Sequence, residues 1–294
     1  MSGICDGRVV IVTGAGGGLG RSYALAFAAE GARVVVNDIN GDAAQGTVDA
    51  IVAAGGEAIA NTSDITNYDD SARAVKQAVD TFGGLDVVVN NAGICRDRMF
   101  ASMSEAEWDA VIAVHLKGHF CISSHAVQYW RAQAKAGEKV SGRIINTASG
   151  AGLNGSIGQS NYAAAKGGIA SLTLNQGAEL ARYGITANAL APSARTGMTE
   201  EVFADMMKKP EGEQDFDHYD PANVAPLVVW LGSEQSGHVT GRVFEVEGGR
   251  ISIADGWRST AGVDKGARWN PAEVGEGVAQ VLADEVPQQK VYGT

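Results

Sequence analysis

The chain has 294 residues, of which 45% are hydrophobic and 19% charged, with a formal net charge of -11. This length suffices for one large α/β domain or two small ones with a sizeable core. The acidic balance argues against a nucleic-acid partner, which needs a basic stripe, and no apolar run reaches the ~20 residues of a membrane helix. With no signal-peptide pattern and only three cysteines, without paired spacing, we expect a protein without membrane association in the cytoplasm.

The first motif is a glycine-rich loop between a strand and a helix. Residues 8–13 form a β-branched run typical of a buried parallel strand, and residues 21–30 have helical periodicity up to Gly31. Glycines let the backbone of such a loop approach a pyrophosphate, which the N–H groups and dipole of the helix N-terminus bind. The motif predicts a dinucleotide site that includes Gly14, Gly18, Leu19 and Gly20.

An acidic residue follows the second expected strand. Residues 33–37 end at Asp38, close to the ~20-residue offset after the loop at which a carboxylate binds the adenosine ribose of NAD. A carboxylate there also repels the extra phosphate of NADP. The alternative is that Asp38 only caps the turn at Asn40-Gly41. We favour NAD as the cofactor, with Asp38 at its ribose.

Strands and helices alternate along most of the chain. We expect helices at 42–54, 68–82, from Gly158 to about 183, and at 222–231. Two more helices are expected within 104–130, the first of which begins with a capping box of Ser104 and Glu107. Further strands are expected at 57–60, 86–89, from 143, at 185–190 and at 242–246. The pattern predicts an α/β fold, a single doubly wound parallel sheet with helices on both faces. We assign residues 1–250 to this core and residues 251–294 to a C-terminal extension, and we expect a mobile lid between Gly197 and Asp220.

Three residues carry the chemistry of an alcohol or a carbonyl. Tyr162 and Lys166 stand at i and i+4, on one face of a helix. A fixed ammonium lowers the pKa of a phenol from its usual ~10, so that Tyr162 can exchange a proton with a substrate oxygen. Ser149 follows the strand that begins at Arg143 and would bring a hydroxyl into the same cleft. Taken alone, the Tyr162 and Lys166 pair is also typical of a solvated helix face.

In their order, the glycine loop, Asp38, Asn90-Asn91-Ala92-Gly93, Ser149 and the Tyr162/Lys166 pair resemble the short-chain dehydrogenase/reductase family. The resemblance implies a Rossmann-fold sheet of about seven strands, a nicotinamide cofactor and an oxidoreductase mechanism. In it Ser149 holds the substrate oxygen, Tyr162 exchanges its proton, and Lys166 binds the nicotinamide ribose and lowers the pKa of Tyr162. It also assigns to the cofactor site Asp64, Ile65, Asn91, Ala92, Gly93, Pro192 and Thr196, together with Tyr162 and Lys166.

One position departs from the family pattern. His115 aligns with the usual fourth catalytic residue, an asparagine, and an imidazole can also relay protons. His119 follows at i+4, but without a third ligand no metal is expected. The Val-His-Leu sequence at His115 is similar to the family branch that holds the dehydrogenase part of peroxisomal multifunctional enzyme type 2. That likeness implies oxidation of a 3-hydroxyacyl-CoA or a related hydroxysteroid with NAD. The family resemblance implies a homodimer or homotetramer.

Other functions stay open. One is a sugar or polyol dehydrogenase, and another is a 3-oxoacyl-acyl-carrier-protein reductase, against which Asp38 counts because those enzymes usually use NADPH. A remote third is a non-catalytic dinucleotide-binding protein. The extension contains Trp257, Arg258, Lys265, Arg268 and Trp269 and an expected helix at 271–283; it is either a surface tail or subunit contact, or a wall of the substrate site.

Overall fold

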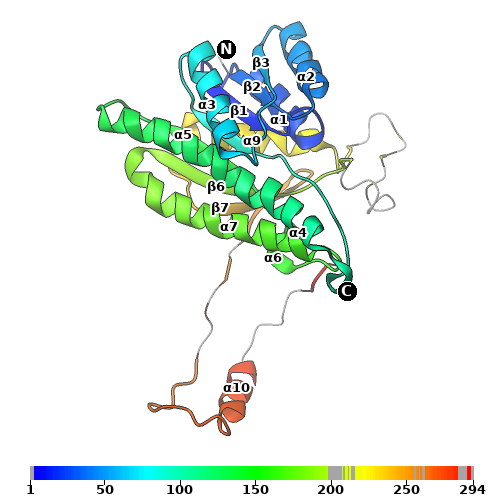
Figure 1. Cartoon of the computed structure of the whole chain (residues 1–294), viewed down its shortest axis with the longest axis vertical. Helices are drawn as coiled ribbons and strands as arrows, with labels where there is room; N and C mark the ends of the chain where they lie inside the picture. Colours follow the sequence, from blue (N-terminus) through cyan, green and yellow to red (C-terminus); the bar gives the residue numbers. More distant parts are fainter. Residues whose placement is uncertain are drawn as a thin grey trace.

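The computed structural model describes residues 3–197, 207, 209–210, 212, 216–254, 256–257, 259, 262–283 and 290–292. In these residues one eight-stranded sheet has the order β3-β2-β1-β4-β5-β6-β7-β8 (Figure 1). Strands β1 to β7 are parallel, and β8 pairs antiparallel with β7. The strands are β1 Val9–Thr13, β2 Arg33–Asn37, β3 Glu57–Asn61, β4 Val87–Asn90, β5 Gly142–Thr147, β6 Ile185–Ser193, β7 Arg242–Glu247 and β8 Arg250–Ala254.

Helices cover both faces of the sheet. The principal ones are α1 Gly18–Ala29, α2 Gly41–Ala53, α3 Tyr68–Phe82, α4 Glu105–Ile112, α5 Gly118–Lys135, α6 Gly150–Asn154, α7 Ser160–Leu180, α9 Ala225–Gly232 and α10 Val274–Ala283. Short 3-10 turns lie at Phe100–Ser102, Ala181–Tyr183, Pro221–Asn223 and Glu234–Ser236. The predicted α/β fold with a doubly wound sheet is confirmed.

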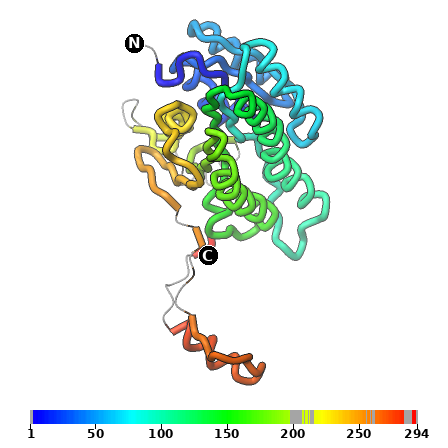
Figure 2. The backbone as a smooth tube through the Cα atoms, turned by 90° about the vertical axis from the view of Figure 1, so that its left-hand side faces the viewer, coloured from blue at the N-terminus to red at the C-terminus, as the bar shows by residue number. Residues whose placement is uncertain are grey.

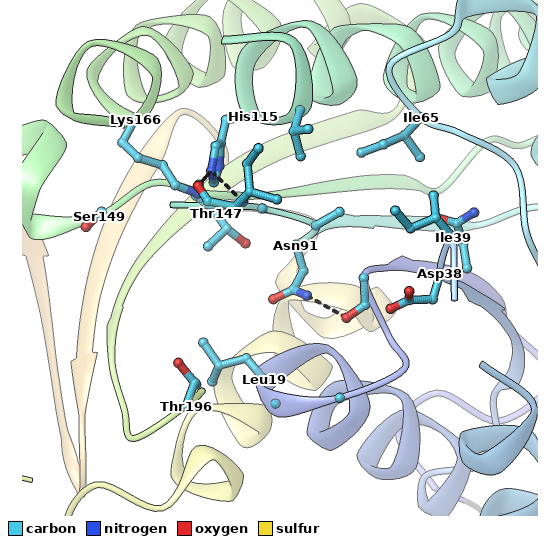
Figure 3. Close-up of a pocket in the computed structure, with 18 of the residues that line it drawn as sticks. Leu19, Asp38, Ile39, Ile65, Asn91, His115, Thr147, Ser149, Lys166 and Thr196 are labelled. Atoms are coloured by element: carbon cyan, nitrogen blue, oxygen red, sulfur yellow. Dashed lines mark hydrogen bonds between the residues drawn. The ribbon is translucent and has the colours of Figure 1, made fainter. Parts of the chain in front are cut away.

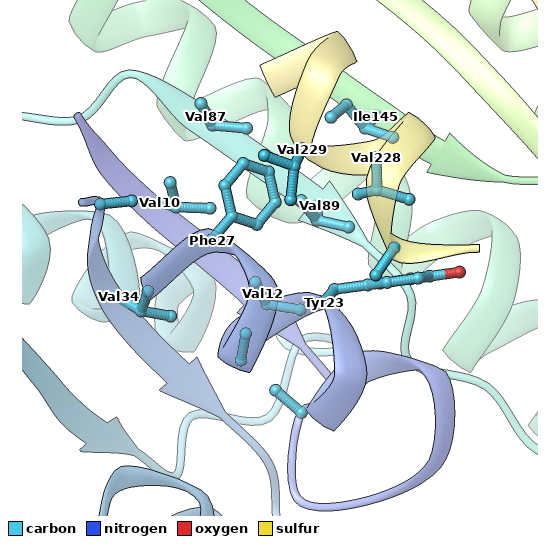
Figure 4. Packing of buried hydrophobic residues seen from close by; sticks show 14 of the residues in the cluster. Val10, Val12, Tyr23, Phe27, Val34, Val87, Val89, Ile145, Val228 and Val229 are labelled. Carbon is cyan, nitrogen blue, oxygen red and sulfur yellow. The ribbon is translucent and has the colours of Figure 1, made fainter. Parts of the chain in front are cut away.

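The central strands are buried on both sides, which explains their uninterrupted β-branched sequences. In β1, Val10 and Val12 point to the face covered by α1 and α9, while Val9 and Ile11 point to the face covered by α3 and α5. Phe27 of α1 packs among the strand valines on the first face (Figure 4). This two-sided core fixes the carboxyl ends of β1, β4, β5 and β6 along one edge, where an open α/β sheet binds its ligands.

The structure extends the sequence prediction in three places. The seven predicted strands are present, but β8 follows the Gly248-Gly249 turn where the sheet was expected to end. The two helices expected within 104–130 are α4 and α5, and they are continuous because a π-helical segment, Ala113–Lys117, joins them. Ser104 and Glu107 do form the predicted capping box. Most of the expected lid, as well as Arg258 of the extension, lies outside the described residues.

The extension leaves the sheet after β8. Helix α10 lies well apart from the rest of the molecule, whereas residues 290–292 lie beside α6 (Figures 1 and 2). Among the helices described, none is both long and apolar enough to cross a membrane. The cytoplasmic location stays a prediction.

Candidate active site

A cavity of about 490 Å³ lies at the carboxyl edge of the sheet (Figure 3). Fifteen of the sixteen residues that the sequence assigns to catalysis or cofactor binding line it, and the structure therefore brings together segments that are far apart in the chain. They are Gly14, Gly18, Leu19, Asp38, Asp64, Ile65, Asn91, Ala92, Gly93, His115, Ser149, Tyr162, Lys166, Pro192 and Thr196.

Gly20 is the exception and lies behind the loop. A Cβ atom at this position would come within 2.2 Å of the carbonyl oxygen of Gly14 and 2.5 Å of the side-chain nitrogen of Asn91. Close packing of α1 on the loop requires a glycine there, so Gly20 shapes the site without facing the cavity.

The glycine loop fits a pyrophosphate. Gly14 and Gly18 have φ angles of 62° and 52°, a region that favours glycine. Within the described part of the chain, no side chain caps α1 at Gly17, and a Cβ at Gly17 would have no neighbour within 4 Å. The first N–H groups of a twelve-residue helix therefore face an open part of the cavity, as an anion site at a helix N-terminus needs.

Asp38 lines the cavity and also holds the loop. One carboxylate oxygen accepts a hydrogen bond from the Gly16 N–H at 3.0 Å, and the other accepts from the Asn40 N–H at 2.9 Å. The turn-capping alternative for Asp38 is thus correct, and it does not compete with ribose binding because the same carboxylate borders the cavity.

Asn91 forms hydrogen bonds with the backbone of the glycine loop. Its side-chain amide donates to the carbonyl oxygens of Thr13 and Gly14 at 3.0 and 3.2 Å. The hydroxyl of Thr13 accepts from the N–H groups of Asn91 and Ala92 at 2.9 and 3.1 Å. These contacts join the ends of β1 and β4. Sequence analysis missed Thr13, whose only signal is its place at the end of the first strand.

The remaining cofactor candidates lie around the cavity. Asp64 is exposed and binds the N–H and hydroxyl of Thr66, each at 2.8 Å, whereas Ile65 is buried. Pro192 is the penultimate residue of β6 and lines the cavity. Thr196 lies near the N-terminus of α1, since a Cβ on Gly18 would be 3.7 Å from its methyl carbon.

Ser149, Tyr162 and Lys166 converge from β5 and α7. Ser149 caps α6, its hydroxyl accepting from the Ala151 N–H at 3.2 Å. Lys166 is 2% exposed, and its Nζ donates to the carbonyl oxygen of Thr147 at 2.6 Å. The same Nζ lies 5.5 Å from the centroid of the Tyr162 ring. The buried lysine excludes the solvated-face reading of this helical pair.

Burial dominates the proton affinities of the pair. It raises the pKa of Tyr162 to about 12, a rise that a hydrogen bond with Ser149 partly offsets. It lowers the pKa of Lys166 to about 7. The pKa of Tyr162 is thus raised overall and not lowered as expected, because desolvation of the phenolate is the largest cause of its shift.

His115 braces the turn that follows β4. Its Nε2 lies 3.0 Å from the amide nitrogen and 2.8 Å from the carbonyl oxygen of Ile94, and its ring meets Tyr162 edge to face with centroids 5.1 Å apart. Burial, reinforced by the charge of Lys166, lowers the pKa of His115 to about 3. Among the residues that the structure describes, its buried Nδ1 has no hydrogen-bond partner. The imidazole is therefore neutral at physiological pH, held as a brace of the backbone.

A metal centre is not assembled in the part of the chain that the structure describes, since no three His, Cys, Asp or Glu side chains gather there. His119 instead accepts a hydrogen bond from the Thr147 N–H at 3.3 Å, and burial keeps its pKa well below the usual range.

Comparisons with known proteins agree with this geometry. A family model described as short chain dehydrogenase matches residues 8–207. The hydroxyacyl-CoA dehydrogenase ChsB1 of Mycobacterium tuberculosis is 44% identical over 297 residues, 98% of this chain and 93% of the relative. Mouse peroxisomal multifunctional enzyme type 2 is 43% identical over 87% of this chain, which spans only 34% of that protein. A crystal structure of a short chain dehydrogenase from Mycobacterium avium is 58% identical, covers 99% of this chain and 100% of its own, and superposes with a TM-score of 0.91.

Proposed function

Because the chain belongs to the short-chain dehydrogenase family, and is thus an oxidoreductase of CH–OH groups, we propose that it interconverts a 3-hydroxyacyl-CoA and a 3-oxoacyl-CoA with NAD. The convergence of Ser149, Tyr162 and buried Lys166 beside the glycine loop supports this proposal. The similarity to ChsB1 along nearly the whole chain supports the thioester substrate.

Each residue has one task in oxidation. The Ser149 hydroxyl donates to the substrate oxygen and orients the alcohol, while Tyr162 removes its proton. Lys166 stabilises the phenolate and, through its contact with Thr147, stays fixed at the end of β5. Gly14, Gly18 and Leu19 would hold the pyrophosphate, Asp38 the adenosine ribose, and Thr196 the nicotinamide side. When bound, the oxidised cofactor would accept a hydride and add a positive charge that favours the phenolate.

The substrate class is tested with a panel of alcohols. We expect NAD reduction with 3-hydroxyacyl-CoA thioesters and weaker reduction or none with sugar alcohols. Hydroxysteroids share the secondary alcohol, so their rate of NAD reduction is measured separately. Turnover of polyols alone would replace the proposal by the polyol dehydrogenase alternative. Cofactor binding without turnover of any alcohol would favour the non-catalytic alternative.

Asp38 should set the preference for NAD. In Asp38→Asn the side chain keeps its size and one oxygen but loses its charge, so we expect the ratio of NADPH to NADH dissociation constants to fall by about tenfold. Fluorescence titration with both nucleotides measures this ratio, and Asp49→Asn on the exposed side of α2 is the matched control. Tighter binding of NADP than NAD by the unmodified chain would contradict the assignment.

His115 should act as a positioning residue. In His115→Gln the carboxamide reaches as far as Nε2 and can bond the Ile94 backbone, so kcat should stay within about fivefold, whereas His115→Ala should lose roughly tenfold or more. The pH profile of kcat between 5 and 8 should have no inflection from this histidine. Loss of activity in the glutamine variant without unfolding would indicate a direct contact with the substrate instead.

We also propose that the chain forms a homodimer or homotetramer. Val274, Val278 and Leu282 of α10 are 41%, 50% and 54% exposed, and the helix lies apart from the sheet (Figure 2). An apolar helix face of this kind is stable in water when another surface covers it. Analytical ultracentrifugation should find an assembly, and a monomer at micromolar concentration would contradict it.

A further inference from the structure

The C-terminal end of the chain returns to the catalytic segment. Residues 290–292 lie beside α6, although α10 lies far from it (Figures 1 and 2). Ser156 forms a parallel bridge with Tyr292. The Ile157 N–H donates to the Tyr292 carbonyl oxygen at 3.0 Å, and the Tyr292 N–H donates to the Gly155 carbonyl oxygen at 3.2 Å. The C-terminus is thereby tied to the connection between Ser149 and Tyr162.

The side chain of Tyr292 lies directly on Gly150. A Cβ atom at Gly150 would be 2.7, 3.0 and 3.2 Å from Oη, Cε2 and Cζ of the tyrosine, which are its three nearest atoms. Gly150 is the residue after Ser149 in the chain, and consecutive Cα atoms are about 3.8 Å apart. The aromatic ring is therefore a close neighbour of the serine that orients the alcohol.

The surface beside Gly150 has apolar, accessible side chains that adjoin the cavity without lining it. Tyr292 and Ile157 are each 49% exposed, although their backbones are hydrogen-bonded to one another. Solvent thus reaches about half of each side chain, and the Tyr292 ring contacts Gly150, which follows Ser149 in the chain. The part of a substrate that extends beyond its alcohol and over α6 would cover this surface, and an acyl chain has the matching apolar character.

We propose that Tyr292 is a specificity-determining residue whose ring, with Ile157, forms the wall that contacts the acyl chain. The inference rests on the proposed function and assigns the substrate-wall role to residues 290–292 of the extension. Trp257, by contrast, is 99% exposed and Trp269 packs against Gly277 of α10. The ring, not the hydroxyl, makes the wall.

Two independent variants remove the ring from its place. Tyr292→Ala deletes it, and Gly150→Ala displaces it, because the new methyl group would occupy its position while the φ angle of Gly150 is not in the left-handed region. Tyr292→Phe keeps the wall. Tyr68→Ala on α3 is the control, since Tyr68 is 38% exposed and its hydroxyl bonds Ser124 of α5 instead of contacting Gly150.

The measurement is kcat/KM for 3-hydroxyacyl-CoAs of increasing acyl length at saturating NAD. For long chains, Tyr292→Ala and Gly150→Ala should each lower kcat/KM roughly tenfold through KM. In these two variants, kcat/KM for the shortest substrate and the dissociation constant of NADH should change less than about threefold. In Tyr292→Phe and Tyr68→Ala, kcat/KM should change less than about threefold at every acyl length. The double variant should be no worse than either single one, because both remove the same contact.

An unchanged length profile in Tyr292→Ala, or full additivity of the two losses, would overturn the inference. Equal losses at all lengths together with weaker NADH binding would also overturn it, since they would indicate a structural role. If the unmodified chain oxidises other alcohols but no acyl-CoA, the proposed substrate is wrong. Tyr292→Ala is then measured with those alcohols, and the inference requires that kcat/KM falls more for bulky substrates than for small ones. A chain that oxidises no alcohol overturns both claims.

Discussion

Replacing Tyr162 by phenylalanine should lower kcat for alcohol oxidation by about 10²–10⁴-fold, the usual range for loss of a general acid or base. The substitution removes only the oxygen that exchanges the proton. The ring would still pack edge to face on His115. NADH affinity and the melting temperature should therefore stay close to those of the unmodified chain.

Steady-state kinetics, a fluorescence titration with NADH and a thermal melt test this expectation together. Tyr183→Phe, at the far end of the same helical path and outside the cavity, is the matched control. Turnover that survives Tyr162→Phe would reject Tyr162 as the acid/base. A large loss of NADH binding would show that the phenol holds the cofactor instead.

Lys166→Met should lower kcat about as much as Tyr162→Phe does, and yet it should stabilise the fold. Methionine fills a buried position without bringing a charge into it. Loss of the hydrogen bond to the Thr147 carbonyl costs about 1 kcal/mol of stability, and this cost does not depend strongly on pH. The phenolate of Tyr162 would lose its cationic neighbour. Activity and stability should thus change in opposite directions.

The stability gain should depend on pH. The folded-state pKa of Lys166 is about 7, below its ordinary value of 10.5. Between these values the unfolded chain binds a proton that the folded chain releases, so the stability of the unmodified protein rises with pH by about 1.4 kcal/mol per unit from this lysine. Below pH 7 the buried cation destabilises the fold fully. The difference in melting temperature, variant minus unmodified, should be larger at pH 6 than at pH 9.

Thermal melts at the two pH values measure the effect, and Lys135→Met on the exposed end of α5 gives the control. A pH-independent difference would mean that Lys166 does not titrate in this range. Wild-type turnover in Lys166→Met would remove the lysine from the mechanism.

Local patterns predicted the fold well because each parallel strand is buried on both sides. Strand β2 and helix α3 have the predicted bounds, since β-branched runs and helical periodicity end there at turn residues. Strand β8 was missed because its residues alternate between partly covered and exposed positions on an edge, a weak signal beside a glycine turn. The π-helical segment at His115 has no local signature, since it depends on how α4 and α5 pack.

The candidate site was predictable in its membership but not in its contacts. Glycine spacing and strand ends indicate which residues meet, and fifteen of them line one cavity. The roles of Gly20 and Asn91 in loop packing depend on backbone atoms that only folding brings near. The sign of the Tyr162 pKa shift was wrong because sequence shows the neighbouring charge but not the depth of burial. The contact of Tyr292 with Gly150 joins positions too far apart in the chain for any periodicity to reveal.

The most direct test of the central claim is to incubate the purified chain with NAD and a 3-hydroxyacyl-CoA and to quantify NADH and 3-oxoacyl-CoA in the same sample. We predict that both products form in equal amounts, that NADP supports the reaction poorly, and that Tyr162→Phe forms neither. Absence of 3-oxoacyl-CoA, while NADH accumulates with another class of alcohol, would contradict the proposed substrate.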